Sequence, residues 1–381
     1  MHCEVTTIDA IEAVPADPWN ALVGSDHPFL RHEFLHALEA TGAVTPETGW
    51  SPRHLLVWQD GSLVAAMPRY AKDHSYGEYV FDWAWADAWE RAGGEYYPKG
   101  LTAVPYTPVP GPRVLLSREA QRQDVLRALA AQCCNDDQSS WHLLFADDAE
   151  VDDWLQVHPQ LIERHAVQFQ WQDRGFGDFE GFLAAMTSKR RKEIRRERRR
   201  VGEQGLVMHR LAGTHIDDAA LEHFYRCYRI TYMERGQHPY LPRAFFQRLR
   251  ERMPESLLLV QARLEGQPVA SALCLQGSHT LYGRYWGSEV EADCLHFETC
   301  YYQGIEHCLA HGLVRFDPGT QGEHKLVRGF APRRLRSLHH IAHPEFHRAV
   351  ARFCKEERGY IEAYHRQALT RLPFRQPENQ Q

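Results

Sequence analysis

The order of predicted helices and strands repeats once along this 381-residue chain, and this repeat is the strongest limit on its fold. Each half begins with helical patterns, continues with strands joined by tight turns, and ends with strand, helix and strand. A chain of this length exceeds a single ordinary core. We therefore predict two tandem domains of similar architecture, 1–176 and 177–381, divided where Gly175 and Gly177 interrupt the pattern.

The strands are predicted from alternating or continuous apolar runs bounded by turn residues. Two such runs on either side of Asp60-Gly61 indicate a hairpin over 53–70, and residues 256–288 indicate a three-stranded meander. Further single strands are predicted at 141–146, 166–173, 313–319 and 333–341. The mixture of hairpins and single strands predicts mixed, mostly antiparallel sheets.

Helical spacing of apolar residues covers most of the remaining chain. Helices are predicted at 28–38, 118–133, 149–155, 217–235, 242–253, 295–310 and 346–369. The last of these is expected to close the second domain. Segment 96–116 carries five prolines and is predicted to be a long, stiff, irregular loop. The fold class is therefore α/β in the wider sense (α+β), with sheets flanked by helices.

The composition is that of an ordinary globular protein, with 43% hydrophobic and 25% charged residues. No apolar run approaches the roughly 20 residues of a membrane-spanning helix. The nine cysteines contain no C-x-x-C pair, which favours free thiols in a reducing compartment over disulfides or zinc. The sequence therefore predicts a cytoplasmic protein.

The segment between Lys189 and Arg200 differs sharply from the rest of the chain. Its twelve residues hold nine Lys/Arg and two Glu, a local charge of 9 − 2 = +7, whereas the whole chain carries −6. The remainder therefore carries −6 − 7 = −13. Glu193 and Glu197 are spaced to pair with basic residues on one side of a helix. Arg191, Arg195 and Arg198 are expected to form an unpaired basic stripe.

A basic stripe on a docked helix favours a polyanionic partner, such as a phosphate, a diphosphate or an RNA backbone. Met186, Ile194 and Val201 form an apolar seam wide enough to dock the helix but too narrow to insert into a membrane. The expected ligand-binding cations are Lys189, Arg191, Lys192, Arg195 and Arg198. A solvated charged surface is the alternative interpretation of such a segment.

Two histidine-rich segments contain possible metal ligands, but neither has the further features of a known metal site. His32–His36 matches H-E-x-x-H, but no Met-turn or third histidine follows it, and 338–343 reads as a strand. No metal site is therefore predicted. The chain also lacks G-x-S-x-G, Walker A and G-x-G-x-x-G patterns, which disfavours serine hydrolases, P-loop NTPases and simple dinucleotide enzymes.

A second polar constellation lies in the second half, at the ends of neighbouring elements. Glu298, His324 and Lys325 are the candidate catalytic residues, the first two as general bases. Gly319 and Gly322 form a turn ahead of a short helix, which can direct backbone N–H groups at an anion. Candidate substrate-binding residues here are Tyr282, Arg284, Trp286, His296, Tyr301, Gln321, Gly322, Glu323 and Arg328. Tyr97 and Lys99 of the proline-rich segment are further candidates, because such loops often carry function.

Three of these segments together resemble the FemAB-like proteins, which are predicted N-acyltransferases of the GNAT superfamily. They are residues 187–201, 96–113 and 282–332, and the resemblance extends from about Pro28 to Phe374. It implies two tandem GNAT-like domains with the substrate between them, so that the basic helix would form one wall of that cleft. It also implies that the closing helix over 346–369 contacts both domains. Related Fem enzymes move amino acids from aminoacyl-tRNA to a peptidoglycan precursor.

The resemblance leaves two acyl donors open. GNAT enzymes that use acetyl-CoA carry an R/Q-x-x-G-x-G/A loop, whereas Arg284 to Glu289 has only its first two anchors and reads as a strand. This favours aminoacyl-tRNA but leaves acyl-CoA possible, and no bound cofactor is implied. The expected activity is acyl or aminoacyl transfer to an amine of a phosphate-bearing acceptor. The alternative is a non-catalytic RNA- or tRNA-binding protein on the same fold.

Overall fold

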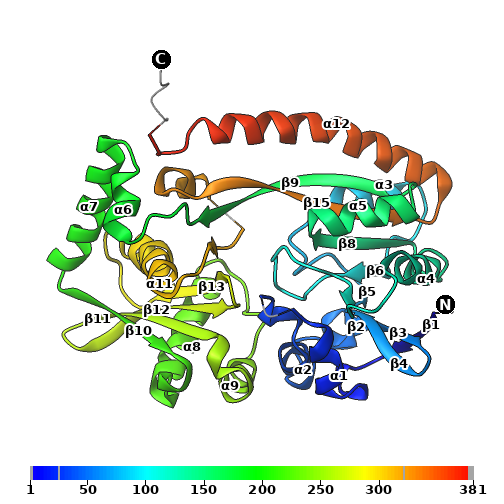
Figure 1. The fold of residues 1–381 in the computed structure, drawn as a ribbon, viewed down its shortest axis with the longest axis horizontal. Coiled ribbons are helices and arrows are strands. Elements are labelled where there is room, and N and C mark those ends of the chain that lie inside the picture. The colour runs from blue at the N-terminus through cyan, green and yellow to red at the C-terminus, as the bar shows by residue number, and fades with distance from the viewer. Residues whose placement is uncertain (1–2, 25, 321, 376–381) are drawn as a thin grey trace. The chain divides into compact units, whose positions relative to one another are not determined.

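The structure, a computed structural model, describes residues 3–24, 26–320 and 322–375. The chain divides into two compact units. The first takes the residues up to 167 together with 334–364, and the second takes 168–333 and the residues from 365 onward. Segment 334–364 thus returns to the first unit, so this division is not a single cut of the chain at residue 176. Figure 1 shows the elements of both units.

The first unit contains two groups of strands. One is a four-stranded sheet in the order β1-β3-β4-β7, and the other follows the order β15-β8-β6-β5-β2. Their bounds are β1 Glu4–Ile8, β2 Trp50–Pro52, β3 His54–Gln59, β4 Ser62–Met67, β5 Tyr70–Lys72, β6 Lys99–Thr102, β7 Leu115–Leu116, β8 Ser140–Ala146 and β15 Ala331–Ile341. The hairpin predicted around Asp60-Gly61 is confirmed, because β3 and β4 pair antiparallel.

The helices of the first unit are α1 Ala16–Leu22, α2 His32–Ala40, α3 Trp83–Arg91, α4 Arg122–Cys134 and α5 Asp148–Val157. The predicted helix over 28–38 is therefore two pieces, a short turn over Pro28–Leu30 and α2. The core between these helices and the strands is apolar and aromatic. Trp141 and Trp154 are fully buried and their rings lie 5.2 Å apart.

The proline-rich segment differs from its prediction as a long, irregular loop. It contributes β6 and β7, and residues 101–111 are buried throughout. The buried Arg113 explains how this backbone is tolerated, because its guanidinium donates to the carbonyl oxygens of Val109, Gly111, Pro112 and Leu144. Five donors on one side chain can replace water for several buried carbonyls.

The second unit is built on strands in the order β10-β11-β12-β13-β14-β9. The predicted meander is confirmed, since β11, β12 and β13 pair antiparallel in sequence. The short β14 pairs parallel with β13 and antiparallel with the end of β9. The bounds are β9 Ile162–Gln172, β10 Leu206–Ala212, β11 Leu257–Leu264, β12 Gln267–Gln276, β13 Thr280–Ser288 and β14 Arg315–Asp317.

Helices cover both faces of this second sheet. In Figure 1, α8 and α9 lie on one face of β10–β13 and α11 lies on the other. The aromatic rings of Phe224, Tyr228 and Phe246 pack against Tyr285 of β13 on the first of these faces. The helices are α6 Phe179–Ala184, α7 Ser188–Glu203, α8 Asp218–Met233, α9 Arg243–Arg252, α10 Leu295–Phe297 and α11 Gln303–His311, with a π turn at Glu298–Tyr302 and a 3-10 turn at Glu323–Arg328.

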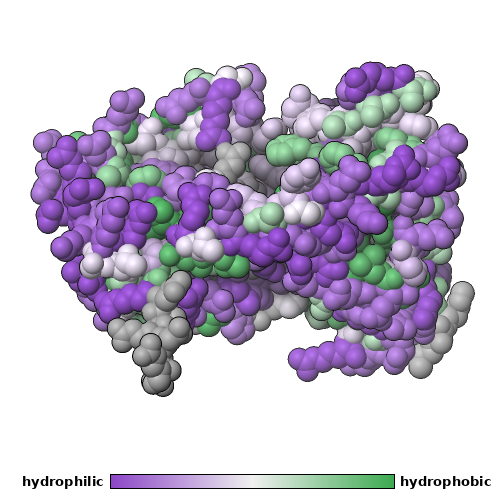
Figure 2. Space-filling model, turned by 90° about the horizontal axis from the view of Figure 1, so that it is seen from above, coloured by the Kyte–Doolittle hydropathy of each residue, from purple (hydrophilic) through white to green (hydrophobic). Residues whose placement is uncertain are grey.

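The last helix, α12 (Pro344–Leu369), begins in the first unit and ends in the second. In the first unit, Val350 and Cys354 pack with Trp85 and Tyr96. In the second, His365 bonds to the carbonyl oxygen of Pro332. Figure 2 shows hydrophilic side chains over most of the face viewed from above. Within the described residues, no helix is both long and apolar enough to cross a membrane.

Candidate active site

The basic segment forms α7, and its apolar seam is buried as predicted. Met186, Ile194 and Val201 are each at most 2% exposed. Six exposed basic residues do not stop the helix from docking, because the seam gives it one buried edge. The first turn contains no acid, so the helix dipole adds no stability there. Packing and ion pairs therefore hold this helix.

Two adjacent residues, Glu197 and Arg198, hold the C-terminal half of α7 by hydrogen bonds to different neighbours. Glu197 accepts hydrogen bonds from Arg328 (2.7 Å) and from the Tyr302 hydroxyl. Arg198 makes a two-pronged pair with Glu298, at 3.0 Å for both contacts, and a further bond of 2.6 Å to Glu306. Such forked pairs are among the strongest polar contacts.

The prediction of an unpaired Arg191, Arg195 and Arg198 stripe is therefore wrong for two of its members. Arg198 is half-buried and held by two carboxylates, and Arg195 pairs with Glu180 of α6. The partners come from outside the helix, so helical spacing alone did not reveal them. Glu197 likewise pairs with Arg328 instead of with a residue of its own helix.

The N-terminal half of α7 keeps the predicted basic surface. Lys189 and Lys192 are exposed and Arg191 is partly exposed. Across residues 3–24, 26–320 and 322–375, no carboxylate pairs with any of these three. Glu193 instead pairs with Arg190 at 2.6 Å. The cations available to a ligand are thus concentrated at the start of the helix.

A pocket of about 540 Å³ lies beside α7, within the second unit. This volume falls in the range of small-molecule sites, about 300–1,000 Å³. Its walls come from α6, α7, β10 and the π turn, and they include Glu180, Arg195, Arg198, Arg199 and Glu298. The pairs Arg195–Glu180 and Arg199–Glu203 are mostly exposed. Exposed pairs contribute little stability, so an anionic ligand can replace their carboxylates.

Glu298 begins the π turn that joins α10 to α11. Its carboxylate is buried, accepting from Arg198 and from the Gln303 amide at 2.7 Å. A π turn inserts one residue into a helix and is frequent at functional sites. Here it directs Glu298 toward α7. The predicted continuous helix over 295–310 is thus interrupted at this candidate residue.

His324 and Tyr301 face each other across 2.8 Å, from the hydroxyl oxygen to Nε2. Burial, with Lys325 and Arg328 nearby, lowers the pKa of His324. His296 contacts both rings, and burial together with His324 lowers its pKa to about 4. Both imidazoles are therefore held in the neutral, proton-accepting form.

Lys325 is 2% exposed and its ammonium donates to the Gly319 carbonyl oxygen at 2.6 Å. Burial lowers the pKa of Lys325 to about 8, although the nearby charge of Asp317 opposes this. Asp317 lies 3.3 Å from Arg284 and accepts the Gly319 N–H at 2.9 Å. The Gly319 N–H, expected to be available to an anion, is thus already bonded.

Gly322 is required by its local geometry. Its φ is +104°, and a Cβ there would approach the His324 ring to 2.0 Å. Any other residue would both strain the turn and displace the imidazole. Gly322 thus positions His324, a role that its presence in a glycine-punctuated turn did not specify.

The remaining predicted residues are distributed as follows. Tyr282 is buried in β13, and Trp286 on the same strand contacts His296 at 5.4 Å between rings. Glu323 pairs with Arg371 at the surface. Arg328 stacks over Phe297 at 3.4 Å besides pairing with Glu197. Gln321 lies outside the described residues.

Tyr97 and Lys99 belong to the first unit, unlike the other predicted site residues. Lys99 is fully buried, with its ammonium 2.8 Å from Glu78 and 2.5 Å from Asp82. Although burial opposes it, these carboxylates hold the pKa of Lys99 above its usual value. Tyr97 bonds to Ser75 at 2.9 Å and lines a separate pocket of about 550 Å³.

Sequence reasoning did not single out Glu197 or Gln303 as parts of this site. Each was visible only as a polar residue on a predicted helix. The role of Glu197 depends on contacts across 105 and 131 residues of chain, with Tyr302 and with Arg328, which helical spacing cannot reveal. Gln303 bonds to Glu298 of the π turn, which apolar periodicity did not predict.

The mixed α/β fold class is as predicted, and the fold is similar to those of several solved structures. A crystal structure of FemX aligns with a TM-score of 0.55 and 12% identity over 91% of this chain and 100% of that one. The C-terminal domain of a putative lysylphosphatidylglycerol synthetase from Agrobacterium fabrum aligns with a TM-score of 0.53 and 8% identity. The alignment covers 90% of this chain and 95% of that one. L-PGS from Bacillus licheniformis aligns with a TM-score of 0.51 and 10% identity, over 87% of this chain and 98% of that one.

The comparison of sequences identifies the family. The FemAB-like family, described as peptidoglycan biosynthesis/recognition, matches residues 10–376. The chain therefore belongs to the FemAB-like family. No curated protein matches it in sequence.

Proposed function

We propose that this protein transfers an acyl or aminoacyl group to an amine of a phosphate-bearing, peptidoglycan-type precursor. Family membership and the likeness in fold to FemX support the reaction class. The observation that carries the proposal is the grouping of a neutral histidine, a buried lysine of lowered pKa and a held carboxylate in one unit. Active sites are where such perturbed groups gather.

His324 is the general base of the proposed reaction. With Nε2–H donating to the Tyr301 oxygen, the Nδ1 lone pair is open to a proton. The acceptor amine attacks the acyl carbon and passes a proton to Nδ1. The carbon–oxygen bond of an aminoacyl ester, or the carbon–sulfur bond of a thioester, then breaks, and the leaving group takes that proton.

Lys325 stabilises the oxyanion that forms when the amine attacks. A buried ammonium acts in a low-dielectric environment, where its charge is worth more than in water. Its ammonium bonds to a neutral carbonyl oxygen and not to a carboxylate. Glu298 serves as a positioning residue, because Arg198 and Gln303 occupy its carboxylate.

The basic start of α7 and the pocket beside it bind the phosphates of the precursor or of the donor's tRNA end. Arg191 and Arg195 are four residues apart and share one side of the helix. Phosphate binds arginine by forked hydrogen bonds, which are stronger than the exposed pair Arg195–Glu180 that they would replace.

The proposal is tested by incubating the purified chain with a UDP-linked muropeptide and either aminoacyl-tRNA or acyl-CoA. Mass spectrometry of the precursor is expected to show one added aminoacyl or acyl group with one donor. His324→Gln should remove this product, and Lys325→Met should slow it. Absence of product with both donors, or an unchanged rate in His324→Gln, contradicts the proposal.

The phosphate-binding surface has its own matched test. Changing Arg191→Gln and Arg195→Gln together removes two charges from the pocket side of α7. Changing Arg196→Gln and Arg200→Gln removes two charges with the same spacing from another side. The first pair should raise KM for the precursor and leave kcat nearly unchanged, whereas the control pair should leave both unchanged. Equal effects of the two pairs would mean that only net charge matters.

A further inference from the structure

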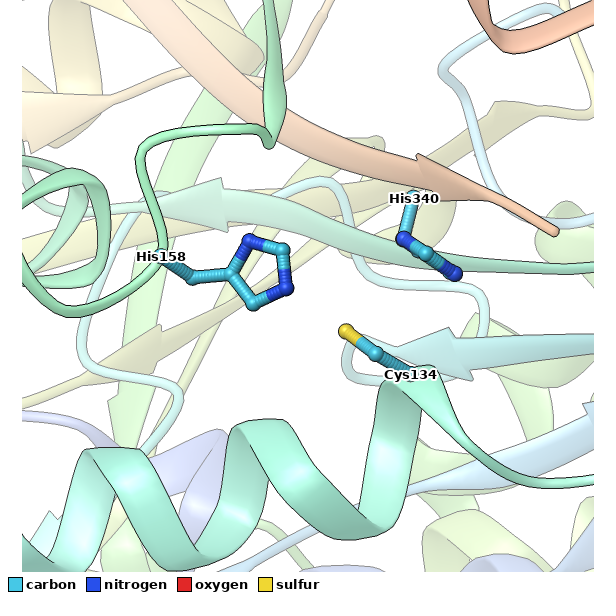
Figure 3. Close-up of side chains that lie close together, drawn as sticks. All are labelled: Cys134, His158 and His340. Carbon is cyan, nitrogen blue, oxygen red and sulfur yellow. The ribbon is translucent and has the colours of Figure 1, made fainter. Parts of the chain in front are cut away.

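Three potential metal ligands meet in the first unit, whereas the residues of the proposed transfer site belong to the second. Cys134 ends α4, His158 directly follows α5, and His340 lies near the end of β15. One ligand atom from each side chain lies within 4.8 Å of the other two. Figure 3 shows the sulfur and the two imidazole rings directed toward one shared space.

The two histidines carry buried polar atoms that the protein itself does not satisfy. Nδ1 of His158 and Nδ1 of His340 are shielded from solvent, and neither has a hydrogen-bond partner among the residues that the structure describes. Buried polar atoms without partners cost stability and are rare in native proteins. The rings are thus not held in place by hydrogen bonds at these atoms, which leaves them available to organise around an ion.

A second cluster of the same kind provides an internal comparison. His223, Cys227 and Glu289 also offer ligand atoms that lie within 4.8 Å of one another. There, however, His223 Nδ1 bonds to the Ser271 hydroxyl at 2.9 Å, and Glu289 pairs with Arg226 at 3.0 Å. That cluster is satisfied by protein contacts, whereas the cluster around Cys134 is not.

We propose that Cys134, His158 and His340 bind one zinc ion. One thiolate and two imidazoles are the donors that Zn²⁺ prefers, whereas Mg²⁺ and Ca²⁺ require oxygen ligands. Tetrahedral zinc places its ligand atoms about 3.3–3.8 Å apart, and small side-chain rotations close the gap from the observed spacing. Water takes the fourth position. On binding, the Cys134 thiol releases its proton to solvent and coordinates as thiolate.

A neutral imidazole offers the lone pair that a metal needs. The prediction that the histidine-rich segment 338–343 holds no metal rested on its strand pattern. The strand is confirmed, but it delivers His340 to two ligands from elsewhere in the chain.

The ion would join the end of α4, the residue after α5 and the strand β15. The segment 334–364, which carries His340, returns to this unit from the far end of the chain. A metal that binds the folded unit and not the unfolded chain stabilises it by mass action. The site is therefore assigned a structural role, and it stands independently of the proposed transfer reaction.

Cobalt(II) tests the ligand set directly in the full chain. The protein is first dialysed against a chelator under reducing conditions and then titrated with Co²⁺. We expect one equivalent to give a thiolate-to-cobalt charge-transfer band and a tetrahedral visible spectrum, both removed by Zn²⁺. Cys134→Ser should lose the charge-transfer band, whereas the matched thiol control Cys294→Ser should retain it.

Histidine variants and thermal unfolding complete the test. His340→Gln should weaken zinc binding by more than the roughly 10- to 100-fold that loss of an outer-shell partner costs, while the exposed control His238→Gln should not. Zinc should raise Tm in the wild type and in Cys294→Ser but not in Cys134→Ser. If Cys134→Ser does not fold, His158→Gln and His340→Gln carry the same test. Equal metal binding by the ligand and control variants would overturn the proposal.

Discussion

Lys99 and Lys325 are both buried, yet their surroundings give them opposite properties. In the first unit, Lys99 contacts two carboxylates, which hold its pKa above the ordinary value against the effect of burial. In the second unit, Lys325 contacts a carbonyl oxygen, and burial lowers its pKa to about 8. Burial alone does not decide what a lysine does, because the charge of its nearest partner sets the outcome.

A third lysine shows that the rule extends within the first unit. Lys72 is also buried, and its ammonium lies 3.1 Å from His74 Nδ1 and over the ring of Trp50. Burial lowers the pKa of Lys72 to about 7. Contact with neutral groups thus accompanies a lowered pKa in both units, and direct contact with carboxylates accompanies a raised one.

The largest expected effect is on stability, through Lys99. Lys99→Met leaves Glu78 and Asp82 buried without their cation, and removing one partner of a buried ion pair costs about 3–5 kcal/mol. Urea unfolding should show this loss in the free energy of unfolding. Lys325→Met removes no carboxylate's direct partner and should cost about 1 kcal/mol or less. Equal losses of unfolding free energy in Lys99→Met and Lys325→Met would contradict the proposed difference between the two lysines.

The second effect is on catalysis, through Lys325. Lys325→Met should lower kcat by roughly 10²–10³-fold, the usual result of removing one oxyanion-stabilising donor. The exposed lysine variant Lys355→Met serves as the control and should leave kcat unchanged. A full kcat in folded Lys325→Met would show that the buried ammonium takes no part in transfer.

The third effect separates the two halves of α7. Arg198→Gln breaks the forked pair with Glu298, and hydrogen bonds to charged groups contribute about 1.5–3 kcal/mol. Arg191→Gln, at a site with no carboxylate partner among the described residues, should change stability by less than about 0.5 kcal/mol. Thermal unfolding of both variants measures the contrast. A larger loss from Arg191→Gln would contradict the assignment.

The smallest effect is on the pH dependence of the rate. Because the pKa of Lys325 is about 8, its charged fraction falls about tenfold between pH 7 and pH 9, and kcat should fall with it. The pKa is lower in the folded chain than in the unfolded one. Between about 8 and 10.5 the unfolded chain therefore binds more protons, and this group makes stability rise with pH. Deprotonation of Lys325 therefore does not destabilise the folded chain over this range, and a decline in kcat cannot be explained by unfolding caused by this group.

Much of the fold was predictable because it is encoded locally. The meander over 256–288 and the apolar seam of α7 follow from residue spacing, and both are confirmed. The resemblance to the FemAB-like proteins rested on long segments and is confirmed by the family match over residues 10–376.

The details of the candidate site depend on contacts that local patterns do not encode. Arg198 meets Glu298 across 100 residues of the chain, so the helix spacing suggested a free cation. The π turn adds one residue to a helix that apolar periodicity presents as continuous. The burial of Lys99 depends on Glu78 and Asp82, which no motif connects to it. In each case the missing information was a tertiary partner.

An NMR titration of the lysine side chains in the intact protein tests the contrast between Lys99 and Lys325 most directly. The chain has only six lysines, at positions 72, 99, 189, 192, 325 and 355, so ¹³C-labelled lysine gives a simple spectrum. Lys72→Met, Lys99→Met and Lys325→Met assign the three buried signals. We expect Lys325 to titrate near pH 8, while Lys99 stays charged beyond the ordinary lysine value of 10.5. Titration of Lys325 at or above 10.5 would contradict the contrast between the two lysines.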